Sequence, residues 1–120
     1  MSKLTRIDQA IRYIKRNWRN GKSLKQIAEI HGFDPGNLAR SFRNSEGVTV
    51  KAFVNRRRKE YVTEQLGNES PFGYEIGRSL GFADDLAFYR WVKRAFGVSF
   101  EELRKRSRRM NSQKVPGSSQ

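Results

Sequence analysis

The sequence predicts an all-α protein of seven helices, forming two helix-turn-helix subdomains joined by a long linker helix. Three observations lead to this fold class. Apolar residues recur at helical spacing along most of the chain, and no window alternates with a period of two. Glycine, proline and N-capping residues mark successive helix ends. Finally, one short stretch of sequence occurs twice.

The repeated stretch runs from Leu24 to Phe33, with the sequence LKQIAEIHGF, and again from Gly73 to Phe82, with the sequence GYEIGRSLGF. Matched residues lie 49 positions apart within the stretch and 50 apart after it, because Ala83 is inserted in the second copy. The matched pairs are Ile27 with Ile76, Gly32 with Gly81, Phe33 with Phe82, Asp34 with Asp84, Gly47 with Gly97 and Val48 with Val98. Each copy is typical of a helix, a glycine turn and a second helix.

The first subdomain is expected to cover residues 1–48 and to contain three helices. An amphipathic helix is predicted over residues 5–19, where the apolar positions are Ile7, Ile11, Ile14 and Trp18. Ser23 is the predicted N-cap of a helix over residues 24–31, which Gly32 ends with a tight turn. Asp34 as cap and Pro35 as first helical residue then predict a third helix over residues 35–45.

A linker helix is predicted over residues 49–66, with an apolar edge formed by Val50, Phe53, Val54, Tyr61 and Leu66. The second subdomain is expected to cover residues 67–109. It contains helices near residues 72–80 and 84–95, and a last helix that Ser99 caps. Residues 110–120 are expected to form a disordered basic and polar tail.

Length and composition limit the possible functions. The 120 residues leave room for one small domain or two very small ones, so no small-molecule effector domain is expected. No apolar stretch can span a membrane and the N-terminus lacks a secretion-signal pattern, which predicts a cytoplasmic, nucleoid-associated protein. The chain has no cysteine and one histidine, so we expect no metal site, no cofactor and no enzymatic activity.

The charge of the chain points to a polyanionic partner. Its formal net charge is +13, from 25 Lys and Arg against 12 Asp and Glu. Charge alone does not distinguish DNA, RNA and anionic lipid, and a highly charged soluble surface has the same composition. The two helix-turn-helix copies favour double-stranded DNA, whose major groove admits an α-helix.

In the first copy, the helix over residues 35–45 is the expected recognition helix. On a helical wheel its apolar side carries Leu38, Ser41, Phe42 and Ser45, and its polar side carries Gly36, Asn37, Arg40, Arg43 and Asn44. Arg40 and Asn37 are the first candidate base readers, because arginine pairs with guanine and asparagine with adenine. Gly36 lets the backbone come close to the groove.

In the second copy, the recognition helix is expected to bury Phe88, Val92 and Ala95, with Trp91 beside them. Its outward residues are Leu86, Arg90, Lys93 and Arg94, with Tyr89 at the border. Leu86 either meets a thymine methyl group or is a neutral exposed leucine. Asp84 is expected to cap the helix, and Asp85 has either a surface role or accepts from a cytosine amino group.

Basic residues of the linker helix offer further contacts with the phosphate backbone. The candidates are Lys51, Arg56 and Arg57, followed by Arg58 and Lys59. A solvated basic face explains the same residues equally well. The linker is about 26 Å long at ~1.5 Å per residue, comparable to the ~34 Å between successive major-groove faces. One molecule can therefore place two recognition helices on one duplex, which predicts binding as a monomer.

These residues resemble the DNA-binding domain of the AraC/XylS family of bacterial transcription regulators. The most specific part runs from Gly81-Phe82-Ala83-Asp84 through Phe88, Arg90 and Lys93-Arg94 to Phe96-Gly97-Val98-Ser99. Residues 27–48 fit the weaker half of the pattern. The chain departs from the family pattern at five positions. The family has proline where this chain has Phe100, small polar residues where it has Leu86 and Tyr89, phenylalanine where it has Val92, and alanine where it has Gly77.

The resemblance implies a transcription regulator, with activation through contact with RNA polymerase. It also implies that DNA faces the positions matching Gly36, Asn37, Ala39 and Arg40, and those matching Asp85, Leu86, Tyr89 and Arg90. Whether this chain activates or represses stays open. The alternative function is a protein-interaction module that binds RNA polymerase or another regulator and touches DNA only nonspecifically, since Gly36, Ala39 and Asp85 are weak readers.

Overall fold

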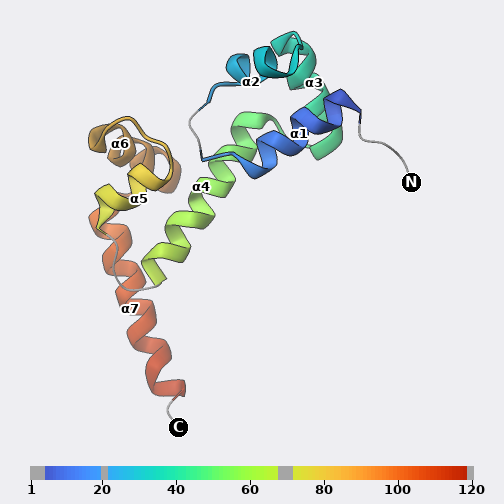
Figure 1. Cartoon of the computed structure of the whole chain (residues 1–120). Coiled ribbons are helices and arrows are strands. Elements are labelled where there is room, and N and C mark those ends of the chain that lie inside the picture. Colours follow the sequence, from blue (N-terminus) through green and yellow to red (C-terminus); the bar gives the residue numbers. More distant parts are fainter. Residues whose placement is uncertain (1–4, 20–21, 68–71, 119–120) are drawn as a thin grey trace. The chain divides into compact units, whose positions relative to one another are not determined.

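The computed structural model describes residues 5–19, 22–67 and 72–118, with side chains through Met110. Within these ranges the chain forms seven α-helices and no strand, which confirms the predicted all-α fold of seven helices (Figure 1). The helices are α1 (Arg6–Arg16), α2 (Leu24–His31), α3 (Pro35–Glu46), α4 (Val50–Gly67), α5 (Gly73–Ser79), α6 (Asp85–Phe96) and α7 (Phe100–Ser118).

The packing divides the chain into two compact units, Met1–Arg57 (unit 1) and Arg58–Gln120 (unit 2). The boundary falls inside α4, so this helix belongs half to each unit. Phe53, in its first half, is buried in the core of unit 1, and Val62, in its second half, is fully buried. The apolar edge that the sequence suggested included Phe53 but not Val62.

Local hydrogen bonds explain where the two candidate recognition helices begin. Asp34 caps α3, because its carboxylate accepts from the backbone N–H of Asn37 at 3.2 Å. Asp84 caps α6 in the same way and accepts from the N–H of Ala87 at 2.7 Å. Each cap satisfies an amide that has no partner inside its helix. Both predicted N-caps are confirmed.

Glycines with positive φ end the paired helices. Gly32 follows α2 at φ 76° and Gly47 follows α3 at φ 80°. Gly81 and Gly97 take the matching places in unit 2, at 85° and 80°. A residue with a side chain is strained in this left-handed conformation, so the repeated glycines determine where both turns form.

The core of unit 1 forms where α3 packs against α1, α2 and the first half of α4. Leu38 and Phe42 of α3 are fully buried, as is Ala28 of α2. Phe42 contacts Phe53 of α4 edge-on, with 5.6 Å between the ring centroids. This packing orients α3, because its apolar side faces the core and its polar side is left at the surface.

The core of unit 2 is built around aromatic rings. Phe88 of α6 is fully buried, and its ring lies 5.6 Å from Phe82 and 5.8 Å from Phe100. Trp91 is only 5% exposed, so it belongs to this core rather than lying beside it as the sequence analysis placed it. The core residues other than these rings include Ile76, Leu80 and Val92, which are almost fully buried.

Arg58 is half-buried and packs against aromatic rings of unit 2. Its guanidinium lies 4.3 Å from the ring centroid of Phe82 and 5.8 Å from that of Trp91. Its Nε is buried and has no hydrogen-bond partner among the described residues, and burial lowers the pKa of this guanidinium. The suggested phosphate contact of Arg58 stays a prediction, and the ring contacts position its side chain against unit 2.

The last helix is longer than the sequence analysis predicted. α7 continues to Ser118, through residues for which we expected an irregular tail beyond Arg109. Residues 104–109 are rich in Arg and Lys, whose helix propensities are high, but residues 110–118 include Asn, Ser, Pro and Gly, so propensity does not account for the extension. In the described part of the chain, no helix has both the length and the apolar character needed to cross a bilayer.

Candidate nucleic-acid interface

The polar side of α3 lies at the surface of unit 1. Asn37, Arg40 and Arg43 are exposed, whereas Ala39 is half-buried. Gly36 is exposed at the start of the helix, and a Cβ there would lie 3.1 Å from a carboxylate oxygen of the cap Asp34. The absence of a side chain therefore leaves the first turn of α3 open to a close approach from outside.

The two residues that the sequence analysis ranked first on α3 contact each other. Nη2 of Arg40 donates to Oδ1 of Asn37 at 3.1 Å. This hydrogen bond uses one of the five N–H donors of the guanidinium and holds the arginine along the outer side of the helix. The amide NH2 of Asn37 keeps its own donors. The first turns of α3 therefore expose N–H donors of both the Arg40 guanidinium and the Asn37 amide.

The outer side of α6 carries three basic residues, one more than that of α3. Arg90, Lys93 and Arg94 are exposed in successive turns, together with Asp85 near the start of the helix. Leu86 is an unusual member of this set because it is apolar and 57% exposed. The opposite side of α6 buries Phe88, Trp91 and Val92. The division between outer and buried residues agrees with the helical wheel except at Trp91, which is buried, and Ala95, which is half-buried.

Tyr89 lies at the border of this surface, 38% exposed, as the sequence analysis placed it. Its ring packs 5.3 Å from Phe88 and 5.9 Å from Phe100. Burial raises the pKa of the Tyr89 hydroxyl, which therefore stays protonated and able to donate at neutral pH. A Cβ at Gly73 would lie 2.6 Å from this hydroxyl oxygen, so the glycine provides the space that the tyrosine occupies.

The basic residues expected to touch phosphate along the linker are exposed on α4. Lys51, Arg56 and Arg57 all lie at the surface. The guanidinium of Arg56 lies 5.7 Å from the ring centroid of Phe53, and that of Arg57 lies 5.5 Å from the ring centroid of Trp18. These contacts position the two arginines without burying them.

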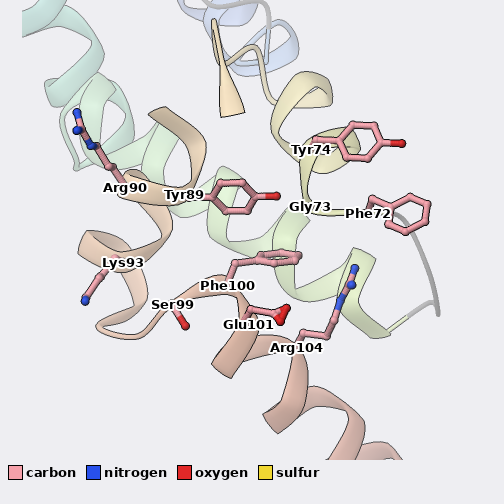
Figure 2. Close-up of a pocket in the computed structure, with 10 residues that line it drawn as sticks. All are labelled: Phe72, Gly73, Tyr74, Tyr89, Arg90, Lys93, Ser99, Phe100, Glu101 and Arg104. Atoms are coloured by element: carbon pink, nitrogen blue, oxygen red, sulfur yellow. The ribbon is translucent and has the colours of Figure 1, made fainter. Parts of the chain in front are cut away.

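One feature beside α6 was missed from the sequence. It is a cavity of about 580 Å³ that we call the aromatic groove (Figure 2). Its walls are chiefly the rings of Phe72, Tyr74, Tyr89 and Phe100, with Arg104 at one end. Phe72 is 59% exposed and Tyr74 is 39% exposed. The available signal was the pair of aromatic residues at the start of α5, to which the sequence analysis gave no role.

Each unit therefore contains a short helix, a glycine turn and a second helix with one buried and one polar side, which defines a tandem helix-turn-helix domain. A family model described as a helix-turn-helix domain matches residues 27–106. The chain belongs to this family, the AraC/XylS type of helix-turn-helix domain. The resemblance identified from the sequence is confirmed.

Similar proteins agree with this assignment. The chain is 27% identical over 99 residues to the Msm operon regulatory protein of Streptococcus mutans, which covers 82% of this chain and 36% of that protein. The chain thus spans about a third of the length of this relative.

Two solved structures share the fold. The C-terminal domain of AraT, a response regulator from Geobacillus stearothermophilus, superposes with a TM-score of 0.71 and 24% identity, over 87% of this chain and 88% of that one. The DNA-binding domain of AdpA, solved in complex with a target DNA, superposes with a TM-score of 0.73 and 16% identity, over 89% of this chain and 96% of that one.

Proposed function

We propose that this chain binds double-stranded DNA with sequence preference and thereby regulates transcription, presenting α3 and α6 to successive major-groove segments as a monomer. One observation carries the proposal. Arg40 and Arg90 are exposed at the same place in two recognition helices of the same construction, each six residues after an aspartate N-cap. A guanidinium at that place can donate to both acceptors on the major-groove edge of guanine.

The first unit supplies a small number of readers. Arg40 is held by Asn37, so less side-chain freedom is lost when it pairs with a base. Gly36 and Ala39 offer no polar side chain to a base, although the open first turn of α3 lets the backbone amides approach a phosphate. We therefore assign to unit 1 a narrow contact in which Arg40 dominates and Arg43 adds charge.

The second unit supplies more of the sequence preference. Leu86 is exposed on the same side as Arg90, where an apolar group can meet the methyl group of thymine. Lys93 and Arg94 lie further along α6 and suit phosphates, which position a protein without reading sequence. Asp85 follows the cap and stays a surface residue in this proposal.

Charge and chain length support the rest of the proposal. The net charge of +13 attracts the chain to DNA at long range, and Lys51, Arg56 and Arg57 add candidate phosphate contacts on α4. The 18 residues of α4 correspond to about 27 Å of helix at ~1.5 Å per residue. Likeness to an operon regulatory protein, and to a domain solved with its target DNA, supports a regulatory role.

In vitro selection from random duplexes tests the proposal, followed by gel-shift titration of the selected site. Arg40→Ala and Arg90→Ala should each weaken specific binding by about 1–3 kcal/mol and relax the preference at one base pair. Arg108→Ala, an exposed arginine of α7, is the charge-matched control and should leave the base preference intact. Sedimentation of the complex should give one 14.0 kDa chain per duplex.

Two results contradict the proposal. If selection returns no motif while a pull-down recovers a stoichiometric protein partner, the chain is an interaction module rather than a reader of DNA. If specific binding requires two chains per site, the monomeric arrangement is wrong. The slope of log affinity against log salt concentration also gives the number of phosphates that the chain contacts.

A further inference from the structure

The aromatic groove has the size and the lining of a small-molecule site. Its volume of about 580 Å³ falls within the ~300–1,000 Å³ that is typical of ligand pockets. Phe72 and Tyr74 stack with an interplanar angle of 8°, and Tyr89 and Phe100 meet edge-on at 5.9 Å. Gly73 lies between these pairs, where a Cβ would lie 3.0 Å from the Phe100 ring. The groove therefore accepts a flat apolar body.

Charged side chains set the polarity of the groove. Three cations line it, Arg90, Lys93 and Arg104, against one carboxylate, Glu101. Figure 2 shows Arg104 and Glu101 on the same side as the four rings, whereas Arg90 and Lys93 extend to the other side. The Arg104 guanidinium lies 5.2 Å from the centroid of the Phe100 ring. It can therefore meet the polar end of a molecule whose apolar body lies against that ring.

The charges around the groove favour a ligand with a negative polar end over a ligand with a positive one. The rings of Phe100 and Tyr74 each already have a guanidinium 5.2 Å from their centroids, from Arg104 and Arg78. A second cation there would be repelled by these arginines and by the net charge of +13. A carboxylate gains from the same charges and can accept two parallel N–H bonds from a guanidinium.

We propose that the aromatic groove binds a small planar organic anion, in its simplest form an aromatic carboxylate, with the ring between the aromatic walls and the carboxylate at Arg104. The site is independent of DNA. Its consequence for DNA rests on the proposed function: Tyr89 forms a wall of the groove and also borders the outer side of α6, so ligand and DNA compete for it. Occupancy of the groove then weakens DNA binding.

Titration of the full chain with 2-naphthoate, followed by ¹H–¹⁵N NMR, tests the site. The expected result is saturable binding with a Kd of about 1 mM or tighter, as a ligand of this size gives. The shifted amides should cluster at residues 72–74, 89 and 99–104. The neutral analogue 2-naphthamide should bind more weakly, because it cannot pair with Arg104.

Matched variants identify the contacts. Tyr74→Ala should weaken 2-naphthoate binding by about threefold to tenfold, whereas Ile30→Ala, the truncation of an exposed apolar side chain in unit 1, should not. Arg104→Gln should weaken binding, and Lys105→Gln, its exposed neighbour with the same charge change, should not. Glu101→Gln should strengthen binding, because it removes the only carboxylate that lines the groove in the described part of the chain.

Several outcomes would overturn the proposal: equal binding of the amide and the carboxylate, unchanged affinity in Tyr74→Ala and Arg104→Gln, or tighter binding of naphthyl-trimethylammonium. The competition has its own readout. A 2-naphthoate concentration near its Kd for the native chain should raise the Kd for the selected duplex in the native chain, and raise it less in Tyr74→Ala. Because the NMR titration contains no DNA, failure of the DNA proposal leaves the test of the groove intact.

Discussion

Alanine at Gly77 should destabilise unit 2, although alanine is the better helix former. A Cβ at this position would lie 2.8 Å from Cγ, 2.9 Å from Cβ and 3.1 Å from Cδ2 of Phe88. Phe88 cannot move aside, because it is fully buried and its ring already contacts Phe82, Trp91 and Phe100. The added methyl group must therefore displace backbone or several rings together.

Two opposing effects determine the size of the change. Overpacking a close-packed core costs about 1–3 kcal/mol, and contacts below 3.0 Å with an immobile ring place Gly77→Ala in the upper half of that range. The gain in helix propensity on replacing glycine by alanine offsets at most ~1 kcal/mol. The expected net loss in the free energy of unfolding is about 1–2 kcal/mol.

Urea unfolding, followed by circular dichroism and tryptophan fluorescence, measures this loss. Gly67→Ala is the matched control, because no described atom lies within 4 Å of its added Cβ, and it should be neutral or stabilising by up to ~1 kcal/mol. Phe88→Ala removes the Cγ and Cδ2 atoms of this clash, so the double variant should be more stable than the sum of the single changes predicts. A Gly77→Ala chain as stable as the native one would refute the packing argument.

Three further predictions concern single contacts. Arg58→Ala should destabilise unit 2 by about 1 kcal/mol in the same urea assay, because the ring contacts of Arg58 are lost. Arg58→Met removes the unpartnered Nε but keeps the volume of the side chain, so its stability should stay within ~1 kcal/mol of the native chain. Asp84→Ala should lower the stability of unit 2 by about 1 kcal/mol, and Asp84→Asn should restore most of it, because either side chain can cap α6. The Lys15 ammonium lies 3.1 Å from the Glu46 carboxylate and lowers the pKa of Glu46 below its usual 4.5. The pair therefore stabilises the fold above pH 4.5, and this stabilisation is lost as the pH falls through the lowered pKa of Glu46. Native chain and Glu46→Gln should therefore differ at pH 7 by at most ~1 kcal/mol, since Lys15 is half exposed, and should converge in acid unfolding titrations.

Much of the fold could be predicted because its signals are local. An aspartate cap is recognised by the residue itself and the amide three positions later, as Asp34 and Asp84 show. A left-handed turn is recognised by its glycine, as at Gly32 and Gly81. Because these signals occur twice with almost the same spacing, the helix-turn-helix pair and the outer positions Arg40 and Arg90 followed from the sequence.

Features that depend on distant packing could not be predicted in the same way. Arg58 is one of four consecutive basic residues, and nothing local distinguishes it from Arg57, which stays at the surface. Its partial burial depends on Phe82, in the turn before α6, and on Trp91 of α6. The aromatic groove likewise depends on where Tyr74 and Phe100, far apart in sequence, meet the outer side of α6. Hydrophobic periodicity predicts on which face of a helix a residue lies, but not which residue of another segment it contacts.

The repeat extends further than the two matched stretches, and α4 shows why. In unit 1, Arg6 of α1 lies 5.6 Å from the ring of the turn residue Phe33, and in unit 2 Arg58 of α4 lies 4.3 Å from the matching ring of Phe82. The second half of α4 therefore does for unit 2 what α1 does for unit 1.

The same helix must also satisfy the core of unit 1 through Phe53. Phe53 and Val62 are nine residues apart, which at ~100° per residue places them on opposite sides of α4. A helix with two buried sides has no single apolar stripe, so its pattern is that of an exposed connector even though both halves are structural. This is why the sequence suggests a linker where the structure has the last helix of one core and the first helix of the next.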